Sequence, residues 1–348
     1  MGEQVLSFGE GSPCFVIAEA GVNHNGDIEL AKDLIRAARE AGADAVKFQT
    51  WVTEDIVTRG SASAEYQQAN TEEESQFQLL KELELPHEAF RELKAFAEEE
   101  GILFLSTPDD SGSARFLVEL GMPLLKTGSG ELTNLPFLAE LAAYGLPMVV
   151  STGMSTLEEV RIAVDLIQRV NSEPLTLLHC VSNYPADPSE CNLRAMDTMA
   201  RELGVTIGYS DHTMGVSVPI AAVARGARVI EKHLTLDRQM PGPDHLCSAD
   251  PAEFKAMMEG IRDVEAALGD GVKRPMPSEL KTLEVVRKEV VTTRSFPKGH
   301  RLEAGDLALK RGSGVGLEPA MLETVYGKIL SQEVEGDDAI TLAILSDA

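Results

Sequence analysis

The chain has 348 residues, 43% of them apolar and 25% charged, which is typical of a soluble globular protein. This length accommodates a barrel of ~250 residues and a small second domain. The net charge of -25 argues against nucleic acid or an anionic membrane as a partner, because either requires a basic face. Four cysteines without metal-finger spacing, no secretory leader pattern and no long apolar run predict a cytoplasmic protein.

Short apolar runs alternate with amphipathic stretches along the first 270 residues. We expect eight strands, at Phe15 to Gly21, Ala45 to Trp51, Ile102 to Pro108, Leu124 to Gly128, Met148 to Thr152, Leu175 to Val181, Thr206 to Ser210 and Val229 to Leu234. The stretches between them are helical in pattern, because apolar residues recur at three and four positions, as between Leu157 and Ile167.

Glycines follow the expected helices and precede the next strands, as helix C-caps do at αβ junctions. They are Gly42, Gly101, Gly121, Gly145, Gly204 and Gly226. The strands are continuous apolar runs, which favours a parallel sheet covered on both faces. Eight βα units predict an α/β fold closed into a TIM (β/α)8 barrel. An open doubly wound sheet is the alternative, but no GxGxxG follows the first strand.

An amphipathic helix is expected from Pro251 to Leu268, and the sequence after it is rich in Gly, Pro and Lys. We expect a catalytic barrel over residues 1–270, a linker over 271–288 and a small β-rich domain over 289–348. The connection 52–86 after the second strand is either a lid or a surface excursion.

Two histidines end successive strands, His212 after Tyr209-Ser210-Asp211 and His233 after Ile230-Glu231-Lys232. In a barrel, the C-terminal strand ends meet at one rim, which places both imidazoles side by side. Two nitrogen ligands without a thiolate suit Mn, Co or Zn and leave positions for water and substrate oxygens. The pattern predicts an open, catalytic metal site.

Side chains alternate across a strand, so residues two apart share a face. Ser210 therefore points with His212, and Glu231 with His233, while Asp211 and Lys232 point toward the helices.

Two lysines enter the same rim from apolar strands in this acidic chain, which indicates an anion site. Lys47 points with Gln49, and Lys126 precedes Thr127-Gly128-Ser129-Gly130-Glu131. Hydroxyls with intervening glycines suit phosphate binding. Those at the strand ends belong to Thr107, Ser129, Ser151 and Ser210. In the proline-rich loop after the eighth strand, Asp244 is a candidate for sugar hydroxyls or for metal support, with an Asx-turn as the alternative.

Several of these segments resemble the sialic acid synthase family. The resemblance rests on Ile17-Ala18-Glu19-Ala20-Gly21-Val22-Asn23-His24-Asn25-Gly26, Val46-Lys47-Phe48-Gln49, Lys126-Thr127-Gly128-Ser129-Gly130-Glu131, Ser151-Thr152-Gly153-Met154, Gly208-Tyr209-Ser210-Asp211-His212 and Pro241-Gly242-Pro243-Asp244-His245. It implies condensation of phosphoenolpyruvate with an N-acetylmannosamine-type aldose, with release of phosphate. It also implies a divalent ion, Mn2+ with Mg2+ or Co2+ as alternatives, and an antifreeze-like (SAF) C-terminal domain.

The resemblance assigns roles to individual residues. His212 and His233 match the metal ligands, and Glu19 matches the catalytic glutamate. Lys47, Thr107, Lys126, Ser129, Ser151 and Ser210 match the phosphoenolpyruvate site. Positions near the sugar are matched by Gln49, Glu131, Tyr184 and Asp244. Arg311 matches an arginine that reaches a partner's barrel in domain-swapped homodimers.

Two positions depart from the family pattern. The family often has Arg-Pro-Gly-x-Gly where this chain has Arg311-Gly312-Ser313-Gly314, which puts the reach of Arg311 in question. Some members have an asparagine where Ser182 stands, with Asn183 beside it, so both are candidates for phosphate binding.

Other functions remain open at this point. The resemblance includes N,N'-diacetyllegionaminate and pseudaminate synthases, which differ in the sugar. A Schiff-base aldolase would use Lys47 or Lys126 as nucleophile. A barrel metallohydrolase is disfavoured, because Asn23-His24-Asn25 replaces His-x-His after the first strand. A sugar-binding protein without catalysis is the non-enzymatic alternative.

Overall fold

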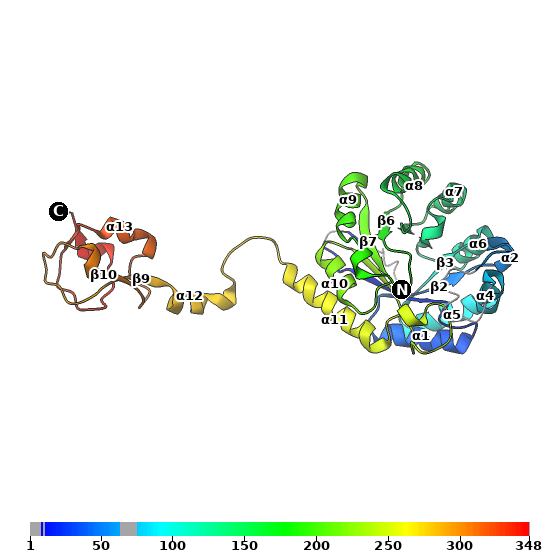
Figure 1. Cartoon of the computed structure of the whole chain (residues 1–348), viewed down its shortest axis with the longest axis horizontal. Helices are drawn as coiled ribbons and strands as arrows, with labels where there is room; N and C mark the ends of the chain where they lie inside the picture. The colour runs from blue at the N-terminus through cyan, green and yellow to red at the C-terminus, as the bar shows by residue number, and fades with distance from the viewer. Residues whose placement is uncertain (1–7, 10, 63–74, 348) are drawn as a thin grey trace. The chain divides into compact units, whose positions relative to one another are not determined.

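The computed structural model describes Phe8, Gly9, residues 11–62 and residues 75–347. Backbone contacts divide the chain into two compact units, Met1–Gly269 and Asp270–Ala348. Figure 1 draws the first from blue to yellow and the second from yellow-orange to red. Within the predicted excursion 52–86 after the second strand, residues 63–74 lie outside the described residues. Its described flanks form the short helices α2, Thr53–Ile56, and α4, Gln76–Leu83.

The first unit is a nearly closed barrel of eight parallel strands, which confirms the predicted TIM-type architecture. The strands are β1 Phe15–Gly21, β2 Ala45–Thr50, β3 Leu103–Pro108, β4 Leu125–Thr127, β5 Met148–Ser151, β6 Leu175–His179, β7 Thr206–Asp211 and β8 Val229–His233. Their hydrogen-bonded order is β3-β2-β1-β8-β7-β6-β5-β4, and β3 also lies beside β4. The predicted boundaries differ from these by at most two residues.

Helices cover the outside of the barrel and bury their apolar faces against it (Figure 1). They are α1 Ile28–Glu40, α5 His87–Glu100, α6 Ser111–Glu119, α7 Leu135–Ala143, α8 Leu157–Val170, α9 Arg194–Leu203, α10 Ser217–Ala224 and α11 Pro251–Leu268. A capping box between Thr156 and Glu159 starts α8, and Val160, Val164 and Ile167 form its buried face as predicted. All six predicted junction glycines have φ between 64° and 97°, the left-handed region that glycine adopts without strain.

Among the described residues, no helix has both the length and the apolar character needed to cross a bilayer. All four cysteines are buried and free.

The second unit has two small antiparallel ladders around its own apolar core. In the first ladder, β9, Lys288–Thr292, pairs with β10, Leu307–Arg311. In the second, β11, Ile329–Leu330, pairs with β12, Leu345–Ser346. The core consists of Val290, Phe296, Leu302, Leu307, Val325, Leu330, Val334 and Ile340. Its helices are α12, Leu280–Val286, and α13, Leu322–Val325. Helix α12 falls within the segment expected to be a linker.

Tight packing between neighbouring strands leaves no room for a side chain at Gly208 in β7. A Cβ there would overlap the carbonyl oxygen of Val229 on β8 and the side chain of Leu178 on β6. We therefore expect Gly208→Ala to lower the free energy of unfolding by about 1–3 kcal/mol, measured by urea denaturation. Gly60→Ala is the matched control, because nothing lies within 4 Å of its added Cβ. Equal stability of the two variants would contradict this account of the barrel.

Candidate active site

The barrel interior changes from apolar to polar along the strands. One layer of inward-facing side chains is apolar and contains Ile17, Ala45, Leu105, Leu124, Val149, Leu178 and Val229. Two residues further along the same strands, or just past their ends, stand Glu19, Lys47, Thr107, Lys126, Ser151, Cys180 and Glu231. Because side chains alternate, this second set continues the inward face, and all of its members are buried. The apolar layer thus forms the floor of a polar site.

A cavity of about 380 Å³ lies over this floor. The predicted site residues that line it are Glu19, Lys47, Gln49, Thr107, Lys126, Ser129, Ser151, Ser182, Tyr184, Ser210, His212 and His233. The other lining residues are Asp109, Gly128, Gly130, Met154 and Glu231. The fold therefore brings residues from every part of the barrel to one cavity at the C-terminal strand ends, where catalytic groups of such barrels lie.

The two lysines at the bottom of the cavity are held by two carboxylates. Lys47 Nζ lies 2.6 Å from Glu19 Oε2 and 3.7 Å from Glu231 Oε2, and Lys126 Nζ lies 3.3 Å from Glu231 Oε1. The ammonium groups also donate to hydroxyls, Lys47 to Thr107 and Lys126 to Ser151, both at 2.9 Å. Such pairing is what allows two ammonium groups to remain charged in a buried site.

Burial raises the pKa of both carboxyl groups, but the neighbouring lysines offset this effect to different extents. Burial raises the pKa of Glu19, and the charge of Lys47 offsets this only in part. Burial alone would also raise the pKa of Glu231, but Lys126 and Lys47 outweigh it, and the pKa of Glu231 falls below its usual range. Glu231 is thus the ionised counterion of both lysines, while Glu19 is poised to exchange a proton near neutral pH.

The two predicted metal ligands stand next to each other, with ring centroids 5.5 Å apart. His212 Nδ1 donates to the carbonyl oxygen of Val181 at 2.7 Å, which leaves Nε2 as its lone-pair nitrogen. His233 Nδ1 is buried without a hydrogen-bond partner. Burial lowers the pKa of both rings, and His212 lowers that of His233 further, so both imidazoles are neutral. Neutral nitrogens of this kind are suitable ligands for a divalent ion.

Within the part of the chain that the structure describes, no group of three or more His, Cys, Asp or Glu side chains is arranged to hold a metal. An ion held by the two histidines would therefore keep coordination positions for water and substrate.

Two further predicted residues surround these rings. The Tyr184 ring lies 4.1 Å from that of His212 and 5.7 Å from that of His233, between centroids. Asp244 is buried behind the cavity lining, with Oδ2 3.7 Å from His233 Nδ1, and burial raises its pKa to about 6. Asp244 is therefore placed to interact with His233 rather than to contact a ligand in the cavity directly.

The serines on the opposite wall pack around a glycine. Ser129 Oγ accepts the N–H of Gly153 at 3.0 Å and lies 3.2 Å from Cys180 Sγ. A Cβ at Gly153 would overlap Ser182 Oγ and come within 2.9 Å of Ser129 Oγ. Glycine is needed here because it lets the hydroxyls of both serines approach the same point.

Besides Asp244, three predicted residues lie away from the cavity lining. Glu131 ends the short helix η1, Ser129–Glu131, and accepts from Asn134 at 2.7 Å. Asn183 is exposed and donates to the Pro185 carbonyl at 3.2 Å. Arg311 belongs to the other unit, where it ends β10.

The sequence interpretation missed two carboxyl groups of the cavity. Glu231 shares its strand face with His233, and that parity was a usable signal for it. Asp109 directly follows β3; burial raises its pKa to about 7. Nothing in the pattern distinguished Asp109 from an ordinary loop aspartate.

The residues expected to face the helices do so. Lys232 Nζ lies 2.6 Å from Asp211 Oδ2 and donates to the Thr213 carbonyl at 2.7 Å, and both charged side chains are buried. Neither lines the cavity. The predicted alternation of side chains along β7 and β8 is therefore confirmed. The two buried charges that face the helices neutralise each other.

The ion pair of Asp211 and Lys232 provides a test of this side-chain arrangement. Asp211→Ala leaves the Lys232 ammonium without its counterion, and we expect the free energy of unfolding to fall by about 3–5 kcal/mol. The double variant Asp211→Leu, Lys232→Met removes both charges and should recover most of that loss. Chemical denaturation measures both. A double variant no more stable than Asp211→Ala would contradict the pairing.

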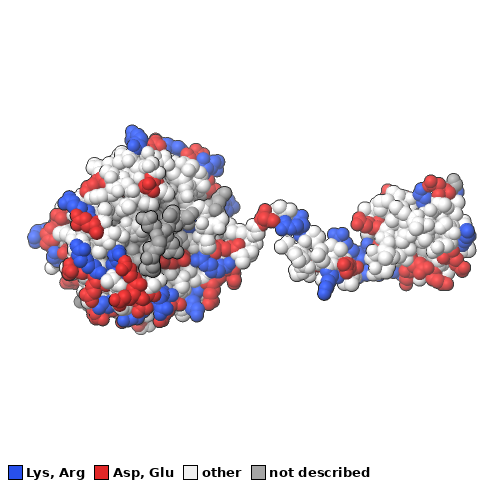
Figure 2. All heavy atoms as spheres, turned by 180° about the vertical axis from the view of Figure 1, so that it is seen from behind, with Lys and Arg blue, Asp and Glu red and all other residues white. Residues whose placement is uncertain are grey.

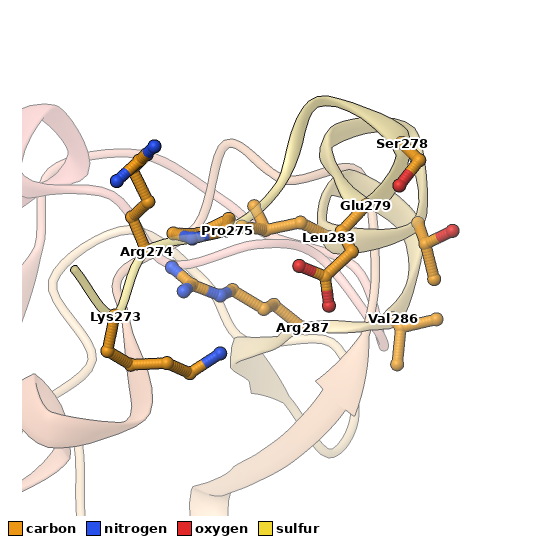
Figure 3. A pocket seen from close by; sticks show the side chains of 9 residues that line it. Lys273, Arg274, Pro275, Ser278, Glu279, Leu283, Val286 and Arg287 are labelled. Atoms are coloured by element: carbon orange, nitrogen blue, oxygen red, sulfur yellow. The ribbon is translucent and has the colours of Figure 1, made fainter. Parts of the chain in front are cut away.

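The second unit has a hollow of its own beside α12 (Figure 3). Lys273 and Arg287 line it together with Glu279, whereas Arg274 pairs with Asp270 at 2.8 Å. None of the predicted site residues belongs to it. On the face drawn in Figure 2, Lys and Arg side chains are interspersed with Asp and Glu over the barrel.

Comparison with known proteins identifies the family. The NeuB family model matches residues 34–273. The N,N'-diacetyllegionaminic acid synthase of Legionella pneumophila is 47% identical over 331 residues, covering 94% of this chain and 93% of that protein. The human N-acetylneuraminate-9-phosphate synthase is 37% identical, covering 94% and 91%.

A solved structure agrees with these matches. The N-acetylneuraminic acid synthetase of Leptospira borgpetersenii, in complex with citrate, has a TM-score of 0.70 and 36% identity, covering 78% of this chain and 91% of that one. The chain therefore belongs to the NeuB family of sialic acid synthases.

Proposed function

We propose that this protein condenses phosphoenolpyruvate with a 2-acetamido aldose of the N-acetylmannosamine type, giving a nine-carbon 2-keto acid and phosphate. The observation that carries the proposal is the cavity itself, where Lys47, Lys126 and the serine hydroxyls face two neutral histidines. Phosphoenolpyruvate matches the cation and hydroxyl side, and a sugar aldehyde matches the histidine side. A second candidate substrate is the diacetamido sugar of a legionaminate synthase, favoured by the 47% identity to such an enzyme.

The charge of the cavity supports a role for an added cation. Lys47 and Lys126 contribute two positive charges, and the carboxyl groups of Glu19, Glu231 and Asp109 number three. A trianionic substrate gains little net attraction from such a lining. Additional positive charge, or proton uptake by Glu19 and Asp109, makes its binding favourable.

We assign this cation to His212 and His233, and the neutral state of both rings fits the assignment. When bound, a divalent ion such as Mn2+, Mg2+ or Co2+ would polarise the sugar aldehyde as a Lewis acid. Asp244 would support His233, and Tyr184 packs on both rings and would border the sugar.

The hydroxyls and lysines would bind phosphoenolpyruvate through their donors. Lys126, Ser129, Ser151 and Ser182 form the wall where several donors converge, and we place the phosphate there. Lys47, Thr107 and Ser210 would hold the rest of this substrate. Hydrogen bonds from Lys47 to Thr107, from Lys126 to Ser151 and from Ser210 to Glu231 fix these donors, so little reorganisation is needed when negative charge develops.

In the reaction, C3 of phosphoenolpyruvate attacks the aldehyde carbon, and the aldehyde oxygen takes up a proton from solvent. C2 becomes oxocarbenium-like and accepts water, which loses a proton to Glu19, the carboxyl group with a raised pKa. Collapse of this adduct breaks the bond between C2 and the bridging oxygen, and phosphate leaves with that oxygen. Gln49 donates to Glu19 Oε1 at 3.1 Å and would orient it.

The remaining assignments concern residues outside the cavity lining. We propose that Glu131 lies near the sugar and Asn183 near the phosphate, and that the second unit is an antifreeze-like (SAF) domain whose Arg311 serves the active site of a partner chain in a domain-swapped homodimer. Arg311 would then supply the further positive charge that the described lining lacks.

Removal of the cation tests the metal assignment. We expect EDTA to abolish phosphate release and Mn2+ to restore it. His212→Ala should lower turnover by more than about 100-fold and lose metal retention, measured by elemental analysis, because one of two ligands is gone. His87→Ala is the control, because His87 is not part of the cavity lining. Full activity of the chelated protein would contradict the assignment.

A panel of sugars tests the reaction and its substrate. Phosphate release from phosphoenolpyruvate should require N-acetylmannosamine or a diacetamido-trideoxy hexose, and the better substrate identifies the sugar; the 6-phosphate of N-acetylmannosamine completes the panel. Borohydride trapping of a keto acid on Lys47 or Lys126 would instead indicate an aldolase. Sugar binding without phosphate release would indicate a binding protein.

A further inference from the structure

The segment that follows Arg311 contains three glycines in five residues, Gly312-Ser313-Gly314-Val315-Gly316. Such a segment has high conformational entropy when nothing holds it. It begins directly at the end of β10, so its conformation determines how the chain leaves Arg311. Its residues are largely exposed, and packing alone does not fix it.

A single buried carboxylate binds both ends of this segment. Glu289, on β9, is 4% exposed. Its Oε1 accepts the backbone N–H of Ser313 at 2.7 Å, and its Oε2 accepts that of Gly316 at 2.5 Å. The neighbouring strand pairing sets Lys288 opposite Arg311. Hydrogen bonds to an ionised acceptor are among the stronger ones, so Glu289 closes the segment into a defined loop.

The glycines make room for this carboxylate. A Cβ at Gly312 would overlap Glu289 Oε1, and one at Gly316 would lie 2.8 Å from Oε2 and 2.9 Å from the Glu289 Cβ. Neither glycine has the positive φ that would by itself require glycine, in contrast to Gly314 with φ of 76°. Space for the Glu289 side chain is therefore what excludes larger residues at both positions.

We propose that Glu289 is a positioning residue for Arg311: its carboxylate fixes the Gly312–Gly316 loop and thereby orients the arginine for the active site. The inference rests on the proposed function, which gives Arg311 its task. Proline in the related Arg-Pro-Gly-x-Gly pattern stiffens the backbone by its ring, whereas in this chain a buried carboxylate does so from the adjacent strand.

Hydrogen exchange of the full-length protein, resolved to single amides, tests the loop. Glu289→Ala should speed exchange at Ser313 and Gly316 by at least about tenfold, because both amides lose their acceptor. Glu289→Gln keeps one acceptor oxygen, so only one of the two amides should be released. Gly312→Ala should resemble Glu289→Ala by displacing the carboxylate, and the double variant should be no worse than Glu289→Ala alone.

Matched controls separate this effect from general destabilisation. Gly305→Ala adds a Cβ with nothing within 4 Å, and Glu323→Ala removes an exposed carboxylate of the same unit. Neither should alter exchange at Ser313 or Gly316. Unchanged exchange in Glu289→Ala would overturn the proposal.

Activity then tests the link to Arg311. Glu289→Ala should lower kcat/KM for phosphate release in the parent chain and cause no further loss in an Arg311→Ala background. Additive losses would overturn the positioning role, because Glu289 would then act on something other than Arg311. A parent chain inactive toward every sugar would contradict the proposed function instead, and the exchange data would still decide whether Glu289 fixes the loop.

Discussion

The buried ion network of Lys47, Glu19, Glu231 and Lys126 is the constraint on which the site depends. Two ammonium groups inside a barrel are stable only beside counter-charges, and strand register supplies these. Glu19 stands opposite Lys47 on one neighbouring strand and opposite His233 on the other. The apolar floor beneath keeps water from screening the network. Small shifts of register would therefore cost both stability and the arrangement of donors.

The network is also compatible with the two kinds of ligand that we propose for the cavity. The positive charges of its lysines and the negative charges of its glutamates nearly cancel, so the cavity has little net attraction for anions. Selectivity would come from fixed donors on the Lys126 and Ser151 side and from neutral imidazoles on the His212 side. Glu231, ionised and shared by both lysines, holds the two halves in place, while Glu19 remains free to exchange a proton.

Much of this arrangement could be predicted from periodicity. Parity along β7 and β8 correctly separated Ser210 and His212 from Asp211, because side-chain alternation is a property of any strand. The junction glycines were predictable for a similar local reason. The ion-pair partners of the buried charges could not be predicted in this way. Glu231 is followed by a lysine in the sequence, yet it forms its ion pairs with lysines on β2 and β4. Contacts of that kind depend on closure of the barrel, which no local pattern encodes. Helix α12 was also missed, since its neighbours Gly271 and Pro275 suggested a linker.

The fate of the bridging oxygen of phosphoenolpyruvate tests the central claim most directly. The protein would be incubated with divalent metal, the accepted sugar and phosphoenolpyruvate carrying oxygen-18 at the bridge between C2 and phosphorus. Mass spectrometry of the released phosphate would then locate the label. The proposed attack of water at C2 predicts phosphate that carries oxygen-18. Unlabelled phosphate would mean cleavage at phosphorus and would contradict the account.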